Sequence, residues 1–238
     1  MRIIKIVILI IIVFLLISSS LGYCTSITYF NHHYQKNSNI IESIVLVTGF
    51  GPFDIYDVNP SQLIAEELNG KHINEAELVG IVLPVDFEES VNVTIHAIED
   101  YDPVLVILVG LSPKAHSIEL EKIGVNLKQM PIGEPKWFFP KRIDPNGPFL
   151  RLSAINTRKI VLDLKESNIP AQQSFFAGTY ICNAVLYETL GYIEYNNLPI
   201  IAGFIHVPLL TSQNSNGMEL DMMVHAIELS INSCLNEN

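Results

Sequence analysis

One cysteine, Cys182, lies where a thiol could act as a nucleophile. It follows an extended apolar run and a break at Ala177-Gly178-Thr179, and a helical pattern begins at this residue. The first N–H groups of a helix have no partner within the helix and carry the positive end of its dipole, so they favour a thiolate over a thiol. A buried structural cysteine is the ordinary alternative, because free cysteine is among the most buried residue types. The choice depends on which other groups the fold brings to Cys182.

A cysteine nucleophile needs an imidazole that accepts its proton, and usually a third group that orients the imidazole. Of the seven histidines, only His206 ends a buried strand, in the apolar run at residues 200–207. The others occupy a polar leader, a polar loop, a helix end or the amphipathic helices. His206 is therefore the predicted base, and a core histidine with both ring nitrogens satisfied is the alternative.

Two glutamates, Glu119 and Glu121, could supply the orienting carboxylate. Side chains alternate along an extended segment, so both glutamates project from the same face of the strand expected at residues 118–127. An exposed polar face with Lys122 opposite explains the same alternation. The spacing by itself does not choose between the two glutamates.

Other site types find little support in the sequence. No close-spaced group of histidines, cysteines or carboxylates has the pattern that zinc requires, so we expect no metal site. Gly49-Phe50-Gly51 follows a strand, but no third glycine or Walker lysine completes a phosphate-binding fingerprint. The same loop offers Phe50 and Phe53, whose rings could hold a flat, uncharged ligand, although core packing is the commoner role of phenylalanine.

Strands that alternate with helices must position these residues. Continuous apolar runs predict buried strands, and apolar residues at helical spacing predict the helices between them. The expected strands cover residues 44–48, 78–83, 104–109, 118–127, 171–175 and 200–207, and the expected helices cover residues 61–69, 86–100, 153–166, 182–190 and 218–235. This order predicts the α/β class, as a three-layer α/β/α sandwich around a twisted, mostly parallel mixed sheet.

Ligands of such folds bind at the carboxyl ends of the strands. We expect four loops to meet at that edge of the sheet, those after Thr48, Val109, Phe175 and Ile205. A further loop, residues 137–149, is rich in proline and phenylalanine and is of the kind that often covers a site. The thiol and the imidazole should therefore meet at this edge.

The first residues predict an export signal. Arg2 and Lys5 precede an apolar run at residues 6–17 and a segment of small residues, which is typical of a secretory signal peptide. We expect a signal peptide at residues 1–22, a flexible leader at 23–42 and the folded domain at 43–238. The chain would then be secreted or lie in the lumen of the secretory pathway. An uncleaved signal anchor is the alternative, although the apolar run is shorter than the roughly 20 residues that span a bilayer.

Charge and cysteine content restrict the partners and the cross-links. The formal net charge is -11, so we expect no nucleic-acid partner. Three cysteines cannot make a disulfide framework, although a lone Cys182–Cys234 bridge is compatible with an oxidising compartment. Asn92-Val93-Thr94 is the only glycosylation sequon with a permitted middle residue.

Four motifs stand in a characteristic order between residue 43 and the C-terminus. They are Val45-Leu46-Val47-Thr48-Gly49-Phe50-Gly51-Pro52-Phe53 with Asn59-Pro60, Ser117-Ile118-Glu119-Leu120-Glu121-Lys122-Ile123-Gly124-Val125-Asn126-Leu127, Ala177-Gly178-Thr179-Tyr180-Ile181-Cys182-Asn183, and Gly203-Phe204-Ile205-His206-Val207-Pro208. In order and spacing they resemble pyroglutamyl peptidase I, the pyrrolidone-carboxylate peptidases of cysteine peptidase family C15. The resemblance implies a cysteine exopeptidase (an omega peptidase) that hydrolyses the N-terminal pyroglutamyl residue from peptides through a thioester intermediate, without a cofactor.

The resemblance also implies a role for individual residues. Cys182 matches the nucleophile, His206 the general base and then acid, and Glu121 the acid that orients the imidazole. Glu121 is selected over Glu119 because it aligns with the glutamate of the family's Glu-Arg pair. The positions implied for the pyrrolidone pocket are Phe50, Phe53, Asn59, Tyr180 and Ile181. The implied partners are small peptides with an N-terminal pyroglutamate, and a homo-oligomer is allowed because relatives with this fold often self-associate.

The sequence departs from the family pattern at several positions. Asp54-Ile55 stands where the family has two glycines, and two basic positions fall on Pro131 and Ala115, the latter next to Lys114. Loss of an arginine that orders the site motivates an alternative, a catalytically weakened member that binds pyroglutamyl peptides without efficient turnover. A plain structural or interaction domain is a third hypothesis, for which the survival of all three catalytic residues would be coincidental.

Overall fold

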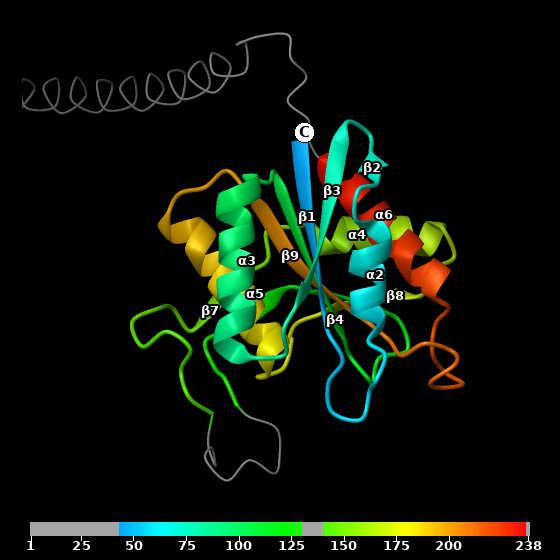
Figure 1. Ribbon diagram of the computed structural model, residues 1–238, viewed down its shortest axis with the longest axis horizontal. Coiled ribbons are helices and arrows are strands. Elements are labelled where there is room, and N and C mark those ends of the chain that lie inside the picture. The colour runs from blue at the N-terminus through cyan, green and yellow to red at the C-terminus, as the bar shows by residue number, and fades with distance from the viewer. Residues whose placement is uncertain (1–42, 130–139, 237–238) are drawn as a thin grey trace, which may run out of the picture. The chain divides into compact units, whose positions relative to one another are not determined.

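A seven-stranded sheet forms the middle layer of the domain (Figure 1). The computed structural model describes residues 43–129 and 140–236. The strands are β1 (Ser43–Phe50), β2 (His72–Ile73), β3 (Ala76–Leu83), β4 (Leu105–Leu111), β5 (Ile118–Glu121), β6 (Ile123–Val125), β7 (Leu150–Leu152), β8 (Ala171–Ser174) and β9 (Ile201–Val207). The helices are α2 (Pro60–Leu68), α3 (Phe87–Tyr101), α4 (Thr157–Glu166), α5 (Ile181–Tyr195) and α6 (Leu220–Leu235). The predicted signal peptide, the predicted leader and Pro131 lie outside the described residues.

The strand order of the sheet is β2-β3-β1-β4-β9-β5-β8. Strands β3, β1, β4 and β9 are mutually parallel, β2 and β5 are antiparallel to their neighbours β3 and β9, and β8 is parallel to β5. Every residue of β4 is buried, because helices cover both faces of the central strands. The predicted mostly parallel mixed sheet is confirmed.

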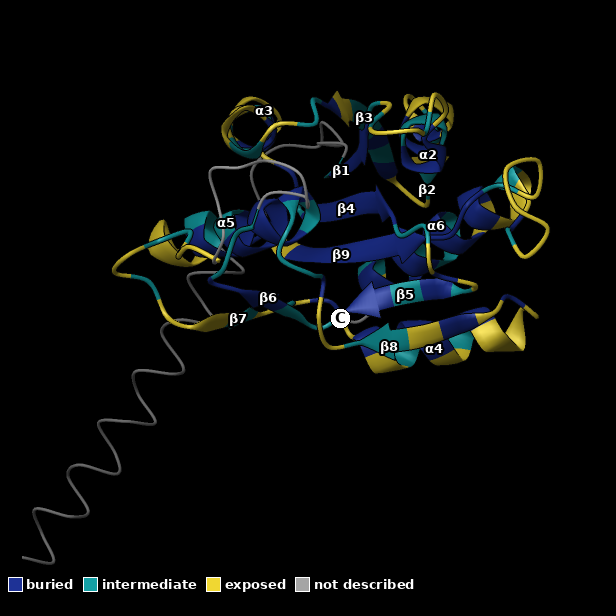
Figure 2. Cartoon of the chain, turned by 90° about the horizontal axis from the view of Figure 1, so that it is seen from below, coloured by how far each residue is buried: buried dark blue, intermediate teal, exposed yellow. Residues whose placement is uncertain are grey.

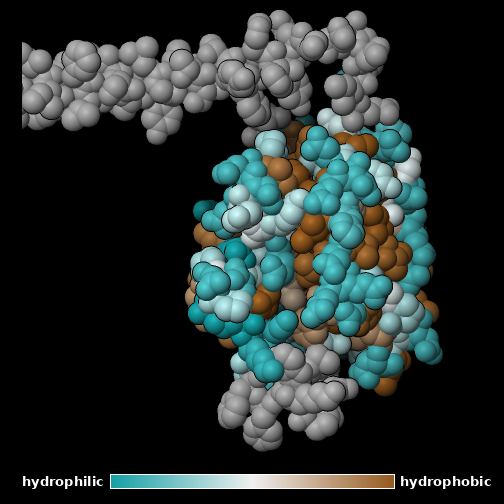
Figure 3. Space-filling view, turned by 60° about the vertical axis from the view of Figure 1, so that its left-hand side comes forward, coloured by the Kyte–Doolittle hydropathy of each residue, from teal (hydrophilic) through white to brown (hydrophobic). Residues whose placement is uncertain are grey.

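Helices form the two outer layers (Figure 2). The apolar side chains of α2, α4 and α6 pack into the core on one face, and those of α3 and α5 pack into the core on the other face. Figure 3 shows a face on which hydrophilic side chains predominate, with hydrophobic side chains visible between them. No helix within residues 43–129 or 140–236 combines the length and the apolar character needed to cross a bilayer. The three-layer sandwich predicted from the strand and helix pattern is therefore correct.

Two features of the strands differ in detail from the sequence pattern. The extended segment expected at residues 118–127 is divided, because β5 belongs to the large sheet whereas β6 pairs with β7 in a separate antiparallel ribbon. The end of β8 does not join the other strand ends at the carboxyl edge, because β5 and β8 run opposite to β9. Residues 175–180 then return the chain to the start of α5, and Phe176, Ala177 and Gly178 line the same pocket as residues that follow β1 and β4. The predicted meeting of the loop after Phe175 with the other loops is therefore confirmed. Strand direction depends on pairings between distant segments, which the local pattern does not contain.

The boundaries of two other segments also differ from expectation. Helix α4 begins at Thr157, not near residue 153, because Asn156 caps it by accepting a hydrogen bond from the N–H of Lys159. Strand β7 was not expected, and its side chains are largely exposed. In contrast, Asp86 caps α3 through the N–H groups of Glu88 and Glu89, within one residue of the predicted start.

Candidate active site

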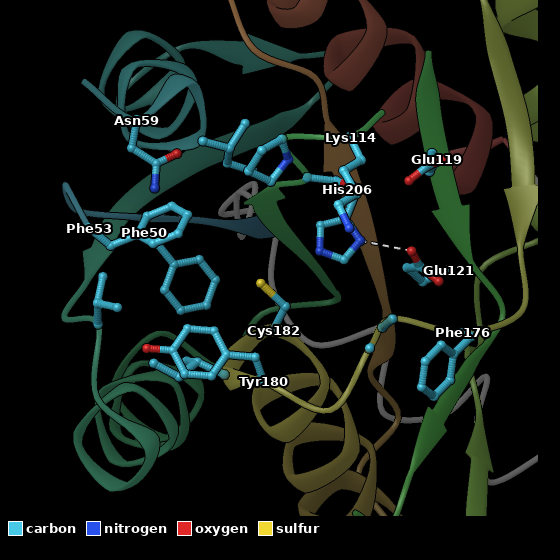
Figure 4. Close-up of a pocket in the computed structure, with 17 residues that line it drawn as sticks. Phe50, Phe53, Asn59, Lys114, Glu119, Glu121, Phe176, Tyr180, Cys182 and His206 are labelled. Carbon is cyan, nitrogen blue, oxygen red and sulfur yellow. Dashed lines mark hydrogen bonds and ion pairs between the residues drawn. The ribbon is translucent and has the colours of Figure 1, made fainter. Parts of the chain in front are cut away.

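A pocket of about 540 Å³ opens at the carboxyl ends of β1, β4 and β9 (Figure 4). All eight residues assigned to the site from the sequence line it. The lining comprises Phe50, Phe53, Asn59, Val85, Leu111, Ser112, Pro113, Lys114, Glu119, Glu121, Phe176, Ala177, Gly178, Tyr180, Ile181, Cys182 and His206. Sequence reasoning did not assign the lining residues between Leu111 and Lys114 or those at 176–178. The residues at 112–114 directly follow β4, and those at 176–178 directly precede α5, and these positions in the sequence could have indicated that they line the site.

Cys182 is the second residue of α5, at the predicted helix entrance. Tyr180 is the N-cap residue, and no side chain caps the first turn. The preceding Gly178 has a φ of 83°, a left-handed conformation that glycine adopts without steric cost. The thiol packs on the end of β4, where a Cβ on Gly110 would lie 3.0 Å from the Cys182 Sγ. The arrangement leaves the positive end of α5 beside the sulfur.

His206 and Glu121 form a buried pair next to the thiol. The His206 Nδ1 lies 2.7 Å from the Glu121 Oε1, and the two side chains are 9% and 1% exposed. Glu119 is the direct cross-strand partner of His206, whereas Glu121 stands opposite Phe204. The hydrogen bond therefore runs diagonally across the β5–β9 pair, a distance that long side chains can cover. The structure brings His206 to Glu121, the glutamate that the resemblance had indicated.

The surroundings of His206 favour its protonated form. Burial lowers the pKa of His206, but hydrogen bonds with Cys182 and Glu121, together with the charges of these two groups, raise it to about 10. A protonated imidazole beside the sulfur supplies the positive charge that stabilises a thiolate. The three groups can therefore hold a nucleophilic sulfur, a proton donor and an orienting carboxylate in one cluster.

Glu119 has a different environment from Glu121. Its Oε1 accepts a hydrogen bond of 2.9 Å from the Gln172 Nε2, and its side chain is partly exposed. Glu119, Glu121 and His206 each offer one possible metal-ligand atom within 4.8 Å of the others, a grouping that sequence reasoning did not anticipate. In this structure the Glu121 Oε1 contacts His206 and the Glu119 Oε1 accepts from Gln172, so one oxygen of each carboxylate is held by a protein group.

The aromatic side of the pocket comes from three segments. Phe50 is buried at the end of β1, and Phe53 is partly buried with its ring centroid 5.5 Å from that of Tyr56. Tyr180 packs edge-on against Phe87, with 5.4 Å between the ring centroids. Ile181 is buried in the first turn of α5 and also lines the pocket. These side chains form a largely apolar wall on one side of the thiol.

Asn59 supports this wall mainly through its own hydrogen bonds. It is the N-cap residue of α2, where its Oδ1 accepts from the N–H and the hydroxyl of Ser61. Its Nδ2 donates to the Gly51 carbonyl, and the Ser61 Oγ accepts from the Phe50 N–H. Glycine at position 49 permits the close approach of β1 and α2, because a Cβ there would lie 1.9 Å from the Ser61 carbonyl oxygen. Asn59 thus fixes the loop that carries both phenylalanines.

Asn183 anchors α5, the helix that carries Cys182, a role that sequence reasoning missed. Its side chain is fully buried, accepts from the Val125 N–H and donates to the carbonyls of Val125 and Leu127. These three bonds tie the first turn of α5 to β6 and the segment after it. A polar residue immediately after a candidate nucleophile was the available signal.

Three expectations about the surroundings are corrected or left open. Cys182 and Cys234 are both free, because Cys234 packs in the core on the opposite face of the sheet from Cys182.

Residues 140–149 do not line the pocket. Asn126 instead binds the backbone of this loop at Ile143, Asp144, Gly147 and Pro148. Residues 137–139 and Pro131 lie outside the described residues. Ala115 is buried, whereas its neighbour Lys114 is exposed at the pocket.

Comparisons with known proteins agree with the four motifs. A sequence profile of the pyroglutamyl peptidase family matches residues 43–237. The pyrrolidone-carboxylate peptidase of Halalkalibacterium halodurans is 34% identical over 203 residues, which cover 79% of this chain and 98% of that protein. The pyrrolidone-carboxylate peptidase of Saccharolobus islandicus is 38% identical over 196 residues, which cover 79% of this chain and 92% of that protein.

Solved structures lead to the same family. The pyrrolidone carboxyl peptidase of Thermococcus litoralis superposes with a TM-score of 0.78 at 32% identity, covering 82% of this chain and 94% of that chain. A mutant pyrrolidone carboxyl peptidase from Pyrococcus furiosus superposes with a TM-score of 0.77 at 35% identity, covering 82% of this chain and 99% of that chain. With the fold, the motifs and the relatives in agreement, this chain belongs to the pyroglutamyl peptidase family.

Proposed function

We propose that this protein is a cysteine exopeptidase that hydrolyses the N-terminal pyroglutamyl residue from peptides, with Cys182 as nucleophile, His206 as acid and base, and Glu121 as the group that orients His206. Membership of the family supports the reaction. The observation that carries the residue roles is the buried 2.7 Å contact of His206 with Glu121, beside a cysteine at the uncapped start of a helix.

The reaction can be followed with these residues alone. The Cys182 sulfur attacks the pyroglutamyl carbonyl carbon, and the negative charge that develops on the oxygen is met by free N–H groups in the first turn of α5. Protonated His206 gives its proton to the leaving amine as the C–N bond breaks, which leaves a thioester. His206 then takes a proton from water, the hydroxide adds to the thioester, and loss of the thiolate releases pyroglutamate. The thiolate and protonated His206 are restored.

The pocket explains selection for pyroglutamate over an ordinary N-terminal residue. The pyrrolidone ring is flat and carries no charged α-amine, so an aromatic wall of Phe50, Phe53 and Tyr180 suits it. A free α-ammonium would lose its hydration on that wall and gain no carboxylate partner there. The acidic groups of the site lie on the other side of the thiol (Figure 4).

A fluorogenic assay tests the activity and the nucleophile together. The purified, reduced chain is expected to release aminocoumarin from pyroglutamyl-aminocoumarin, with the activity abolished by C182S and retained by C234S, the matched control in the opposite core. Loss of activity in both variants would remove the assigned role of Cys182. A folded chain that binds a pyroglutamyl peptide by calorimetry but releases no coumarin would overturn the hydrolase proposal in favour of the binding protein.

We propose in addition that the chain enters the secretory pathway, on the basis of Arg2, Lys5 and the apolar run at residues 6–17. N-terminal sequencing of the protein from its own cells is expected to begin near Tyr23. A product that retains Met1 and fractionates with membranes would instead indicate an uncleaved anchor.

A further inference from the structure

The pocket has a second side that the pyrrolidone ring does not need. In Figure 4, Phe50, Phe53 and Tyr180 lie on one side of Cys182, whereas His206, Glu121, Glu119 and Phe176 lie toward the other. Phe176 and Glu119 line the pocket but have no role in the proposed chemistry. This side is therefore available to another part of the substrate.

The chemistry decides which part of the substrate that is. His206 must give its proton to the leaving amine, so this amine has to lie on the His206 side of the sulfur. The ring occupies the aromatic wall on the opposite side. The peptide that follows pyroglutamate must then continue past His206 toward Phe176.

Phe176 has the exposure expected of a binding wall. The residue is 59% exposed although it borders the pocket, so a ligand side chain packed on its ring would remove apolar surface from water. The neighbouring Phe175 is equally exposed at 59%, but it does not line the pocket, and its ring lies 5.8 Å from the Lys122 Nζ. The two adjacent phenylalanines thus differ in position and not in exposure.

The charges on this side do not favour a substrate residue of either sign. Lys114 is exposed at the pocket and makes no hydrogen bond or ion pair with the other described residues. Glu119 brings the opposite charge and is held by Gln172. Glu121 and His206 pair with each other, so Lys114 and Glu119 are the remaining charged groups of the lining, one of each sign. Apolar contact is therefore the main source of preference.

We infer that Phe176 forms the subsite for the residue that follows pyroglutamate, and that this subsite prefers a large apolar side chain. The inference rests on the proposed function, because it assigns the leaving peptide of that same reaction. It adds a specificity residue to the nucleophile, base and ring pocket already described.

Paired substrates and paired variants test the subsite. Pyroglutamyl-phenylalanine amide and pyroglutamyl-alanine amide differ in the side chain that would meet Phe176, and both lack a free carboxylate that could bind Lys114. The F176A variant is expected to lower kcat/KM for the phenylalanine substrate about tenfold, which corresponds to roughly 50 Å² of lost apolar contact, and to affect the alanine substrate much less. F175A is the matched control and is expected to leave both values unchanged.

The outcomes separate this inference from the proposed function. Equal losses on both substrates in F176A, or equal behaviour of F176A and F175A, would overturn the subsite while leaving the peptidase intact. Absence of release from either substrate by the folded, reduced wild-type chain would overturn the peptidase and the subsite with it. Circular dichroism melting is expected to match among the three proteins, since both phenylalanines are exposed.

Discussion

Gly110, in β4 close to the thiol, offers a sharp test of the packing at the site. A Cβ on this residue would lie 2.7 Å from the Phe204 Cζ and 3.0 Å from the Cys182 Sγ. Favourable contacts between nonbonded heavy atoms lie near 3.5–4.0 Å. The G110A substitution therefore requires the Phe204 ring to move by about 1 Å and the Cys182 sulfur to move by about 0.5 Å or more.

The structure indicates which atoms would move. Phe204 is fully buried, and its ring centroid lies 4.7 Å from that of His206, so the ring has little room. The thiol borders the open pocket and can be displaced into it. Overpacking of this kind costs about 1–3 kcal/mol of unfolding free energy, and a misplacement approaching 1 Å lowers the rate by up to about 100-fold. We therefore expect kcat/KM of G110A to fall about 10- to 100-fold.

The G51A variant is the matched control. Gly51 also lies at the end of a sheet strand near the pocket, but a Cβ there would meet only the Leu83 carbonyl oxygen, at 3.8 Å. Coumarin release gives kcat/KM, the rate of alkylation by iodoacetamide reports on the sulfur, and urea unfolding gives the free energy. Wild-type activity and stability in G110A would refute the packing argument, and an equal loss in G51A would assign the effect to the loop backbone.

Two further predictions concern the anchoring of α5 and the protonation of His206. The N183A variant leaves the N–H and carbonyl of Val125 and the carbonyl of Leu127 without their partner, so urea unfolding should show that the free energy of unfolding falls by about 3–5 kcal/mol. The control N92A changes an exposed residue in α3, and its free energy of unfolding should stay within about 0.5 kcal/mol of the wild type. Equal stabilities of N183A and N92A would contradict the anchoring role of Asn183. Because the pKa of His206 is raised from 6.5 to about 10, its protonation adds stability that is fully present below pH 6.5 and is lost as the pH rises through 10. Urea unfolding of the wild type and H206Q should therefore differ most at pH 6 and progressively less toward pH 10, and a difference that grows with pH would contradict the assignment.

One of the departures from the pattern that the resemblance implied lies beside the pocket. Ala115 is buried in the turn after β4, where its N–H donates to the Ser112 carbonyl. Lys114 presents a cation to the pocket from the adjacent position. A positive charge therefore lies at the pocket from the position next to 115, where the resemblance implied a basic residue.

Much of the fold followed from the sequence because its signals are local. A continuous apolar run such as that of β4 is typical of a strand buried on both faces, and all seven residues of β4 are buried. The alternation of such runs with amphipathic segments predicts helices on both faces of a mostly parallel sheet. The short motifs around Cys182 and His206 also indicate their local structure: Cys182 lies at the start of a helix, and His206 lies at the end of a strand.

The tertiary structure decided which of these residues meet. Alternation placed Glu119 and Glu121 on one face, but only the antiparallel pairing of β5 with β9 and the diagonal reach of Glu121 bring a carboxylate to the His206 Nδ1. The direction of β8 and the return through residues 175–180 place Cys182 at the same edge, and the sheet separates it from Cys234. Local periodicity carries the type of each element, whereas strand direction and register come from pairings between residues far apart in the chain.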